Sequence, residues 1–469
     1  MVTSTTKAYG QTLLLLPILW LLAVTVPHLE QGDFRRDTGR YAAVGLYMWS
    51  GGSFLQPHLN PETPYFNKPP LALWIHGLCL RLFGVHLTVA RLPSIVAALG
   101  VVCLSVLTAR QIGSNAEALT SGVVLALSYE FFRRTREISL DFWQLFFLLL
   151  AAFLVVRAAK QNKKGLLIAA GLPIGLALLC KPLVGLGAIP IFAIWLWLLR
   201  NARQWRWLLF GTVPVALLVA LPWHLYMWQQ FGDQFTHKYF HEETLNRAKG
   251  LLGSESRLYY LRILASTYWP WLMAVGYAIY FRSSKPARKP ERDLVLLGGS
   301  WVVLTLLLLS FFPGKQVNYA LPVYPMLSWV AAAGLCRIPW HPLRDWYRRR
   351  LAGAATAAVL VLLTMSLAPI KFQRPPDQDW AALFRWLDQH AIPPENVSQR
   401  DLDYDDICYF YLKRGKWLPN AAMDPSMKSG TKQPEFVLKR VSGNQLVGPQ
   451  SPTFRSGDLT LYALHQLNN

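Results

Sequence analysis

A polar segment between residues 30 and 87 carries side chains that are suited to group-transfer chemistry. It holds Asp37 and Arg40 close together, and Lys68 follows further along. A carboxylate beside a binding site can accept a proton from an attacking hydroxyl or amine, while Lys and Arg can hold a phosphate leaving group. The alternative is a solvated loop in which Asp37 and Arg40 form a helical i, i+3 pair.

Two further charged residues lie at the ends of apolar blocks. Asp141 begins one such block, and Lys181 lies between two others. A charge at the edge of a bilayer is costly and usually has a partner. For Lys181, a phosphate ligand and a structural lysine whose ammonium reaches the membrane surface are equally good interpretations.

The composition of the chain places these residues in a membrane protein. Of 469 residues, 53% are hydrophobic and only 16% are charged, whereas a soluble domain carries about 25% charged residues. The apolar residues form blocks of about the 20 residues that cross a bilayer as a helix. We therefore predict a mainly α, polytopic protein with about eleven transmembrane helices. They are expected near residues 11–29, 88–109, 116–132, 139–159, 165–180, 183–199, 207–228, 261–281, 294–312, 317–336 and 351–369.

The loops between these blocks predict the orientation of the chain. Lys and Arg gather in every second loop, for example at residues 160–164, 200–206 and 282–292. Cytoplasmic loops collect such residues, so the N-terminus is expected in the cytoplasm and residues 30–87 on the opposite side. The net charge of +21 is spread over these short tracts. This pattern argues against a nucleic-acid partner, which would favour one extended basic face.

Three arginines oppose this orientation rule. Arg133, Arg134 and Arg136 fall on the outer side, beside Glu130 and Glu137. Something anionic should offset their charge. Pairing with the two glutamates is one interpretation, and binding of a carrier diphosphate or an anionic acceptor is the other.

Two segments outside the predicted spans have their own character. Residues 71–83 are apolar with two charged or polar interruptions and predict a helix that lies in the membrane interface. Residues 371–469 lack a block of spanning length and predict a small extracytoplasmic α/β domain, separate from a transmembrane domain at residues 1–370. Within it, a helix is expected at 379–390 and strands at 435–441 and 459–464.

The first polar segment resembles the corresponding loop of the aminoarabinose transferase and protein O-mannosyltransferase superfamily, which are multi-span glycosyltransferases of the GT-C type. Four features match in order and spacing: Asp37, Arg40-Tyr41, Pro57-His58-Leu59 and Lys68-Pro69-Pro70. Downstream, the pattern continues over roughly residues 10 to 335. It includes Asp141, Glu242-Glu243 with Arg247, and Lys315 before Asn318-Tyr319.

The resemblance implies a transferase that takes a sugar from a polyprenyl-phosphate carrier, such as undecaprenyl phosphate, in a bacterial inner membrane. The acceptor would be lipid A, a glycan, another lipid or a protein, and the configuration would invert. Asp37 would be the general base, with Asp141 as a second carboxylate that orients the acceptor or shares this role. The cations expected to hold the donor phosphate are Lys68, Arg247, Arg40, Lys181 and Lys315; residues expected to position the acceptor or the loop are Tyr41, His58, Glu243 and Tyr319.

One departure from the family pattern bears on cofactors and substrate. Asn67 stands before Lys-Pro-Pro, where aminoarabinose transferases usually carry a glutamate associated with a metal contact. No cofactor is therefore predicted, with a divalent metal as the alternative, and aminoarabinose is not assigned as the sugar. The rival function is a transporter or flippase of lipid-linked sugars, which would also have many spans.

Overall fold

The computed structural model is mainly helical and divides into two compact units. The larger unit consists of residues 15–29, 66–72 and 91–338, and the smaller contains residues 30–65 and 73–90 together with the tail. The residues that the structure describes are 15–30, 34, 36–51, 53–60, 63–199, 201–246, 249, 254–284, 289–338, 378–392, 397–399, 412, 436–440, 454–456 and 459–463.

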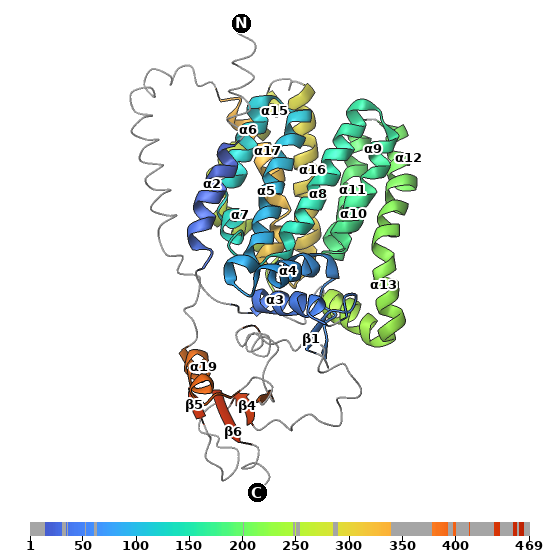
Figure 1. Ribbon diagram of the computed structural model, residues 1–469. Coiled ribbons are helices and arrows are strands. Elements are labelled where there is room, and N and C mark those ends of the chain that lie inside the picture. The colour runs from blue at the N-terminus through green and yellow to red at the C-terminus, as the bar shows by residue number, and fades with distance from the viewer. Residues whose placement is uncertain are drawn as a thin grey trace, which may run out of the picture. The chain divides into compact units, whose positions relative to one another are not determined.

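Helices that run side by side make up the larger unit (Figure 1). α17 packs against α6, α15 and α16, and α10 packs against α8 and α13. The α-helices are α2 (Leu16–Thr25), α5 (Leu87–Ile112), α6 (Asn115–Ala126), α7 (Tyr129–Arg134), α8 (Leu140–Gln161), α9 (Lys164–Ala169), α10 (Gly171–Leu178), α11 (Pro182–Leu198), α12 (Ala202–Trp207), α13 (Val213–Thr236), α14 (Tyr259–Thr267), α15 (Trp269–Ser284), α16 (Lys289–Phe311) and α17 (Val323–Leu335). Short 3-10 or π turns are η1 (Val26–His28), η2 (Leu208–Thr212), η3 (His237–Asn246) and η4 (Val317–Ala320).

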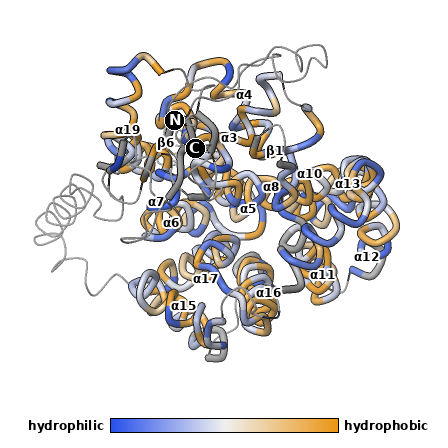
Figure 2. Tube along the Cα trace, turned by 90° about the horizontal axis from the view of Figure 1, so that it is seen from below, coloured by the Kyte–Doolittle hydropathy of each residue, from blue (hydrophilic) through white to orange (hydrophobic). Residues whose placement is uncertain are grey.

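Ten of the predicted spans fall on helices of this unit, and the span expected at 351–369 lies outside the described residues. Within the described part of the chain, four helices are long and apolar enough to cross a bilayer, at Leu87–Ile112, Leu140–Gln161, Gln204–Glu242 and Arg292–Phe311. Large apolar side chains such as Trp197, Phe210, Leu218 and Met273 are exposed. Figure 2 shows apolar positions on the outward faces of α13, α15 and α16. Such faces suit lipid, so this is a multi-pass membrane protein. The exact count of eleven spans stays a prediction.

The first polar segment folds as α3 (Arg36–Trp49), a short antiparallel pair β1 (His58–Asn60) and β2 (Thr63–Pro64), and α4 (Pro70–Phe83). α4 confirms the helix expected at 71–83. α3 and α4 cross where Gly45 meets Gly77, because a Cβ atom on Gly77 would lie 2.0 Å from the carbonyl oxygen of Gly45. Trp49 Nε1 donates a hydrogen bond of 2.8 Å to Trp74 O. The backbone of α3, on which Asp37 stands, is thus fixed by close packing to α4.

The described part of the tail contains one helix and a four-stranded sheet. The elements are α19 (Gln378–Gln389), β3 (Val397–Gln399), β4 (Phe436–Arg440), β5 (Phe454–Ser456) and β6 (Leu459–Ala463). The strand order is β3-β4-β6-β5, with β3 and β4 parallel and the other pairs antiparallel. α19 packs on β5 and β6 and buries Trp380, Leu383 and Leu387. The expected helix and strands are confirmed, while the proposed boundary at residue 371 lies outside the described residues.

Candidate active site

Asp141 is the centre of a polar cluster at one end of the larger unit. It lies in the first turn of α8, and its carboxylate forms an ion pair with the ammonium of Lys181. Asn318, in η4, donates a hydrogen bond of 3.1 Å from Nδ2 to the other carboxylate oxygen. The side chains of Asp141 and Lys181 are only 14% and 13% exposed. Three segments that lie far apart in the sequence therefore meet at one carboxylate.

The position of Lys181 follows from a break between two helices. α10 ends at Leu178 and α11 begins at Pro182, which leaves Lys181 extended as the N-cap residue, with φ −154° and ψ 120°. Proline disfavours helical geometry in the residue before it and is well suited to the first helical position. Gln144 Nε2 donates a hydrogen bond of 2.5 Å to Lys181 O. The ammonium also lies 5.5 Å from the ring centroid of Tyr319, which is within cation–π range.

Lys315 lies in the loop between α16 and η4, and it is buried. Its ammonium donates to the backbone carbonyls of Phe312 and Glu255, the second at 3.4 Å. Burial lowers the pKa of Lys315, and the Glu255 carboxylate opposes this shift. Glu255 N also donates to Pro313 O at 2.9 Å, so the loops at 254–258 and 312–316 support one another.

Asp37 and Arg40 lie on α3 in the smaller unit. Arg40 Nη1 is 3.4 Å from Asp37 Oδ1, and the Asp37 side chain is 62% exposed. The i, i+3 pair expected from the sequence is present, and an exposed ion pair of this kind contributes little to stability. Tyr41, in contrast, is buried within its unit. The carboxylate of Asp37 is therefore accessible to solvent.

His58 lies on β1 and is held by its own loop. Its Nδ1 donates a hydrogen bond of 2.9 Å to Gln56 O, and its ring centroid is 5.6 Å from that of Tyr47. Burial lowers the pKa of His58, and the Gln56 carbonyl works against that shift. The imidazole is thus predominantly neutral at pH 7.

The remaining predicted site residues are only partly described. Lys68 Nζ donates a hydrogen bond of 3.0 Å to Asn67 O. Glu243 belongs to η3, but its side chain is outside the described part of the structure, and Arg247 lies outside it entirely. The structure brings Asp141, Lys181 and Tyr319 together in one unit and Asp37 and Arg40 together in the other. Their catalytic and binding roles stay predictions.

Two of the three arginines that oppose the orientation rule are paired with glutamates. Arg133 forms ion pairs with Glu130 at 3.0 Å and with Glu137 at 2.7 Å, and Arg134 contacts the same two glutamates. Arg136 is buried and donates to the Val24 carbonyl. Of the two interpretations left open by the sequence, the structural one is confirmed for Arg133 and Arg134.

Two residues of the Asp141 cluster were not identified as site residues from the sequence. Gln144 is a buried polar residue three positions after Asp141 in an apolar helix. Asn318 stands directly before Tyr319 in a segment noted for its resemblance. A polar residue inside a spanning helix is a signal of function or pairing, and this signal could have identified Gln144.

Comparisons of sequence and of fold relate this chain to the same group of known proteins. Residues 67–228 match the family described as dolichyl-phosphate-mannose-protein mannosyltransferase. An undecaprenyl phosphate-alpha-4-amino-4-deoxy-L-arabinose arabinosyl transferase of Enterobacter sp. (strain 638) is 27% identical over 74% of the chain. The crystal structure of ArnT from Cupriavidus metallidurans bound to undecaprenyl phosphate has a TM-score of 0.67 at 20% identity, covering 98% of both chains. The chain is thus similar in sequence to this mannosyltransferase family and to the arabinosyl transferases, and it shares the fold of ArnT.

A second solved structure and the lengths of the relatives show how far the similarity of this chain extends. An archaeal oligosaccharyltransferase, AglB from Archaeoglobus fulgidus, in complex with an inhibitory peptide and a dolichol-phosphate, has a TM-score of 0.57 at 13% identity and covers 97% of this chain and 62% of its own. The chain spans 65% of the length of the Enterobacter relative and 58% of that of the corresponding Yersinia pestis (strain Pestoides F) protein, to which it is also 27% identical. The family resemblance stated from the motifs is confirmed.

Proposed function

We propose that this GT-C protein is a membrane glycosyltransferase that moves a sugar from a polyprenyl-phosphate carrier to an acceptor at the outer face of a bacterial inner membrane. The observation that carries this proposal is the cluster of Asp141, Lys181, Asn318 and Tyr319 at one end of the helices, in a fold shared with ArnT bound to undecaprenyl phosphate. The relatives named as undecaprenyl-phosphate arabinosyl transferases support the same donor class.

Asp37 is the proposed general base. Its exposed carboxylate can accept the proton from the acceptor hydroxyl or amine as that atom forms a bond to the anomeric carbon of the sugar. The bond from the anomeric carbon to the phosphate oxygen breaks, and its electron pair leaves with the carrier phosphate. Attack from the face opposite the phosphate inverts the configuration. Arg40, 3.4 Å away, orients Asp37.

Cationic side chains are proposed to stabilise the leaving phosphate. Lys68, Arg247 and Lys315 serve this purpose, because charge builds on the phosphate oxygens in the transition state. Lys181 already has Asp141 as its partner, so we assign to these two residues the positioning of the site. Because Asp141 is held in this pair, we assign it the role of orienting the acceptor and not a share in proton transfer.

The orientation of the chain supports the donor class. Described basic residues such as Arg110, Lys160 and Lys163 lie at the helix ends away from the Asp141 cluster, as the positive-inside rule requires for an outward-facing site. An outward site has no access to cytosolic nucleotide sugars, and no Walker or Rossmann glycine loop occurs in the sequence. We therefore propose a lipid-linked donor and an extracytoplasmic acceptor, which is a lipid, a glycan or a protein.

The test is turnover by the purified protein in detergent micelles. Undecaprenyl-phosphate sugars and acceptor lipids and glycans would be extracted from a strain that lacks the protein, and release of free undecaprenyl phosphate would be measured by mass spectrometry. A transferase releases the carrier phosphate in micelles, where no gradient or second compartment exists. The rival transporter leaves the lipid-linked sugar intact, and this result would overturn the proposal.

A further inference from the structure

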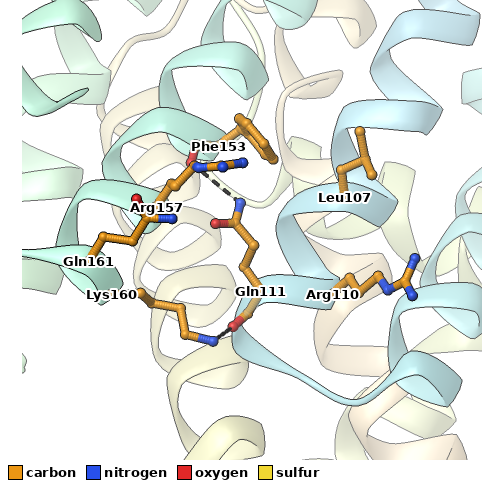
Figure 3. A pocket seen from close by; sticks show the side chains of 7 residues that line it. All are labelled: Leu107, Arg110, Gln111, Phe153, Arg157, Lys160 and Gln161. Carbon is orange, nitrogen blue, oxygen red and sulfur yellow. Dashed lines mark hydrogen bonds between the residues drawn. The ribbon is translucent and has the colours of Figure 1, made fainter. Parts of the chain in front are cut away.

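A basic cavity lies between the C-terminal ends of α5 and α8, at the opposite end of α8 from Asp141. It has a volume of about 470 Å³ and is lined by Arg110, Arg157 and Lys160 (Figure 3). Among the described side chains that line it, none is acidic. α8 has 22 residues, and a helix rises about 1.5 Å per residue. The lining residues of α8 follow Asp141 by 12 to 20 positions, so the cavity is roughly 18 to 30 Å from the Asp141 cluster and is distinct from it.

The cations of the cavity have no carboxylate partner within the described part of the chain. Lys160 donates to the Gln111 carbonyl, and Arg110 donates a hydrogen bond of 2.9 Å to Asn115 Oδ1. The Arg157 guanidinium lies 5.9 Å from the ring centroid of Phe153. Glu117, seven positions after Arg110, is engaged in the capping box of α6 with Ser114. Three cationic side chains thus line one cavity, and none of the described residues that line it is acidic.

Apolar side chains line the same cavity one helical turn deeper. Leu107 precedes Arg110 by three residues on α5, and Phe153 precedes Arg157 by four on α8. Residues with this spacing lie on the same face of a helix. Gln111 Nε2 is 3.5 Å from Phe153 O, which joins the two helices across the cavity. The cavity therefore offers cations at the rim and an apolar wall toward the membrane interior, a combination that fits an amphiphilic anion.

We propose that this cavity binds an anionic phospholipid. The headgroup phosphate is held by Arg157, Arg110 and Lys160 through charge-assisted hydrogen bonds, and an acyl chain lies along Leu107 and Phe153. In the orientation proposed above, the lipid belongs to the inner leaflet. Because its ligands come from both α5 and α8, the bound lipid holds these two helix ends together.

The experiment compares two variants of the full-length protein with equal charge. One carries Arg110→Gln, Arg157→Gln and Lys160→Gln. The control carries Lys163→Gln, Arg206→Gln and Arg292→Gln, which are exposed and do not line the cavity. Purified proteins are titrated with short-chain phosphatidylglycerol, phosphatidylcholine or inorganic phosphate. Bound lipid is counted by native mass spectrometry, and the thermal unfolding midpoint is followed in parallel.

The cavity variant is expected to lose one tightly bound phosphatidylglycerol that wild type and control retain. A basic residue near an anionic lipid surface strengthens binding by about fivefold, so three removed cations weaken it on the order of a hundredfold. Equal binding by both variants, or an equal effect of inorganic phosphate or phosphatidylcholine on wild type, would overturn the proposal. If the triple variant folds poorly, Arg157→Gln alone serves as the test, because Arg157 is exposed and has no hydrogen bond in the described structure. This single variant should bind phosphatidylglycerol about fivefold more weakly than wild type.

Discussion

Asp37 and Asp141 have surroundings that suit different tasks. Asp37 is largely exposed and has Arg40 beside it, whereas Asp141 is mostly buried and is held by Lys181 and Asn318. A base must be free to accept a proton, while a residue that positions others gains from fixed partners. The two carboxylates are therefore not interchangeable.

Asp37→Asn tests the assignment of the base. The substitution preserves size and removes the proton acceptor, so turnover should fall by at least about a hundredfold. Donor binding should change little, and the loss of an exposed side-chain pair should cost within about 0.5 kcal/mol of stability. Turnover and donor binding would be measured on the same purified variant. If most activity remained, Asp141 would become the leading candidate for the base.

Lys68→Ala and Arg247→Ala test the phosphate ligands. Each removes charge-assisted hydrogen bonds worth about 1.5 to 3 kcal/mol, which corresponds to about a tenfold to hundredfold loss in donor affinity or rate. Protein yield and unfolding midpoint serve as the control for folding. Normal activity of both variants at normal protein levels would remove these residues from the site.

The pair of Asp141 and Lys181 predicts non-additive mutations. Asp141→Asn or Lys181→Gln alone leaves a mostly buried charge without its partner, which should destabilise the protein on the order of 1 to 3 kcal/mol given the partial exposure. The double variant should be more stable than the less stable single variant. Unfolding midpoints in detergent for wild type and the three variants complete the cycle. Simple additivity would show that the ion pair contributes no coupling.

At the scale of elements, the sequence predicts helices better than it predicts their interruptions. Blocks of about 20 apolar residues identify α5, α8 and α16, because hydropathy over a spanning length is a strong signal. The expected span at 116–132 is instead α6 followed by α7, and that at 165–180 is α9 followed by α10. These breaks depend on local backbone geometry and packing, which hydropathy does not report.

The candidate site was predicted in its residue types and not in its contacts. The charge at the edge of an apolar block indicated that Lys181 needs a partner, but it did not indicate which one. Asp141 precedes Lys181 by 40 positions, and Asn318 follows Asp141 by 177 positions. Such pairings depend on which helices become neighbours. The close approach of Gly45 to Gly77 could not be predicted either, because a glycine within a helix has several explanations in a single sequence.

That crossing gives an element-scale prediction. A methyl group on Gly77 would clash with the Gly45 carbonyl at 2.0 Å, so Gly77→Ala should force α3 and α4 apart. We expect a loss of about 1 to 3 kcal/mol and reduced turnover, because α3 carries Asp37. Gly276→Ala on α15 is the matched control, since its Cβ atom meets nothing within 4 Å. The control should be neutral or slightly stabilising, as alanine is the better helix former. Equal unfolding midpoints for the two variants would contradict the close crossing.

At the scale of the whole molecule, orientation links the proposed donor class to the sequence. Basic residues such as Arg110, Lys160 and Lys163 lie at the helix ends away from Asp141, and this asymmetry predicts the outer side for residues 30–87 and for the tail. A reporter that is active only outside the cytoplasm, fused after Asn469, should therefore be active. The same reporter fused after Lys163, which follows the first four predicted spans, should be inactive, because that loop carries Lys160, Lys163 and Lys164. A cytoplasmic reporter gives the reverse pattern at both positions.

Cytoplasmic activity after Asn469 would contradict the odd number of spans. Cytoplasmic location of residues 30–87, measured by labelling a single cysteine placed there, would also remove the argument for a lipid-linked donor, because nucleotide sugars would then reach Asp37.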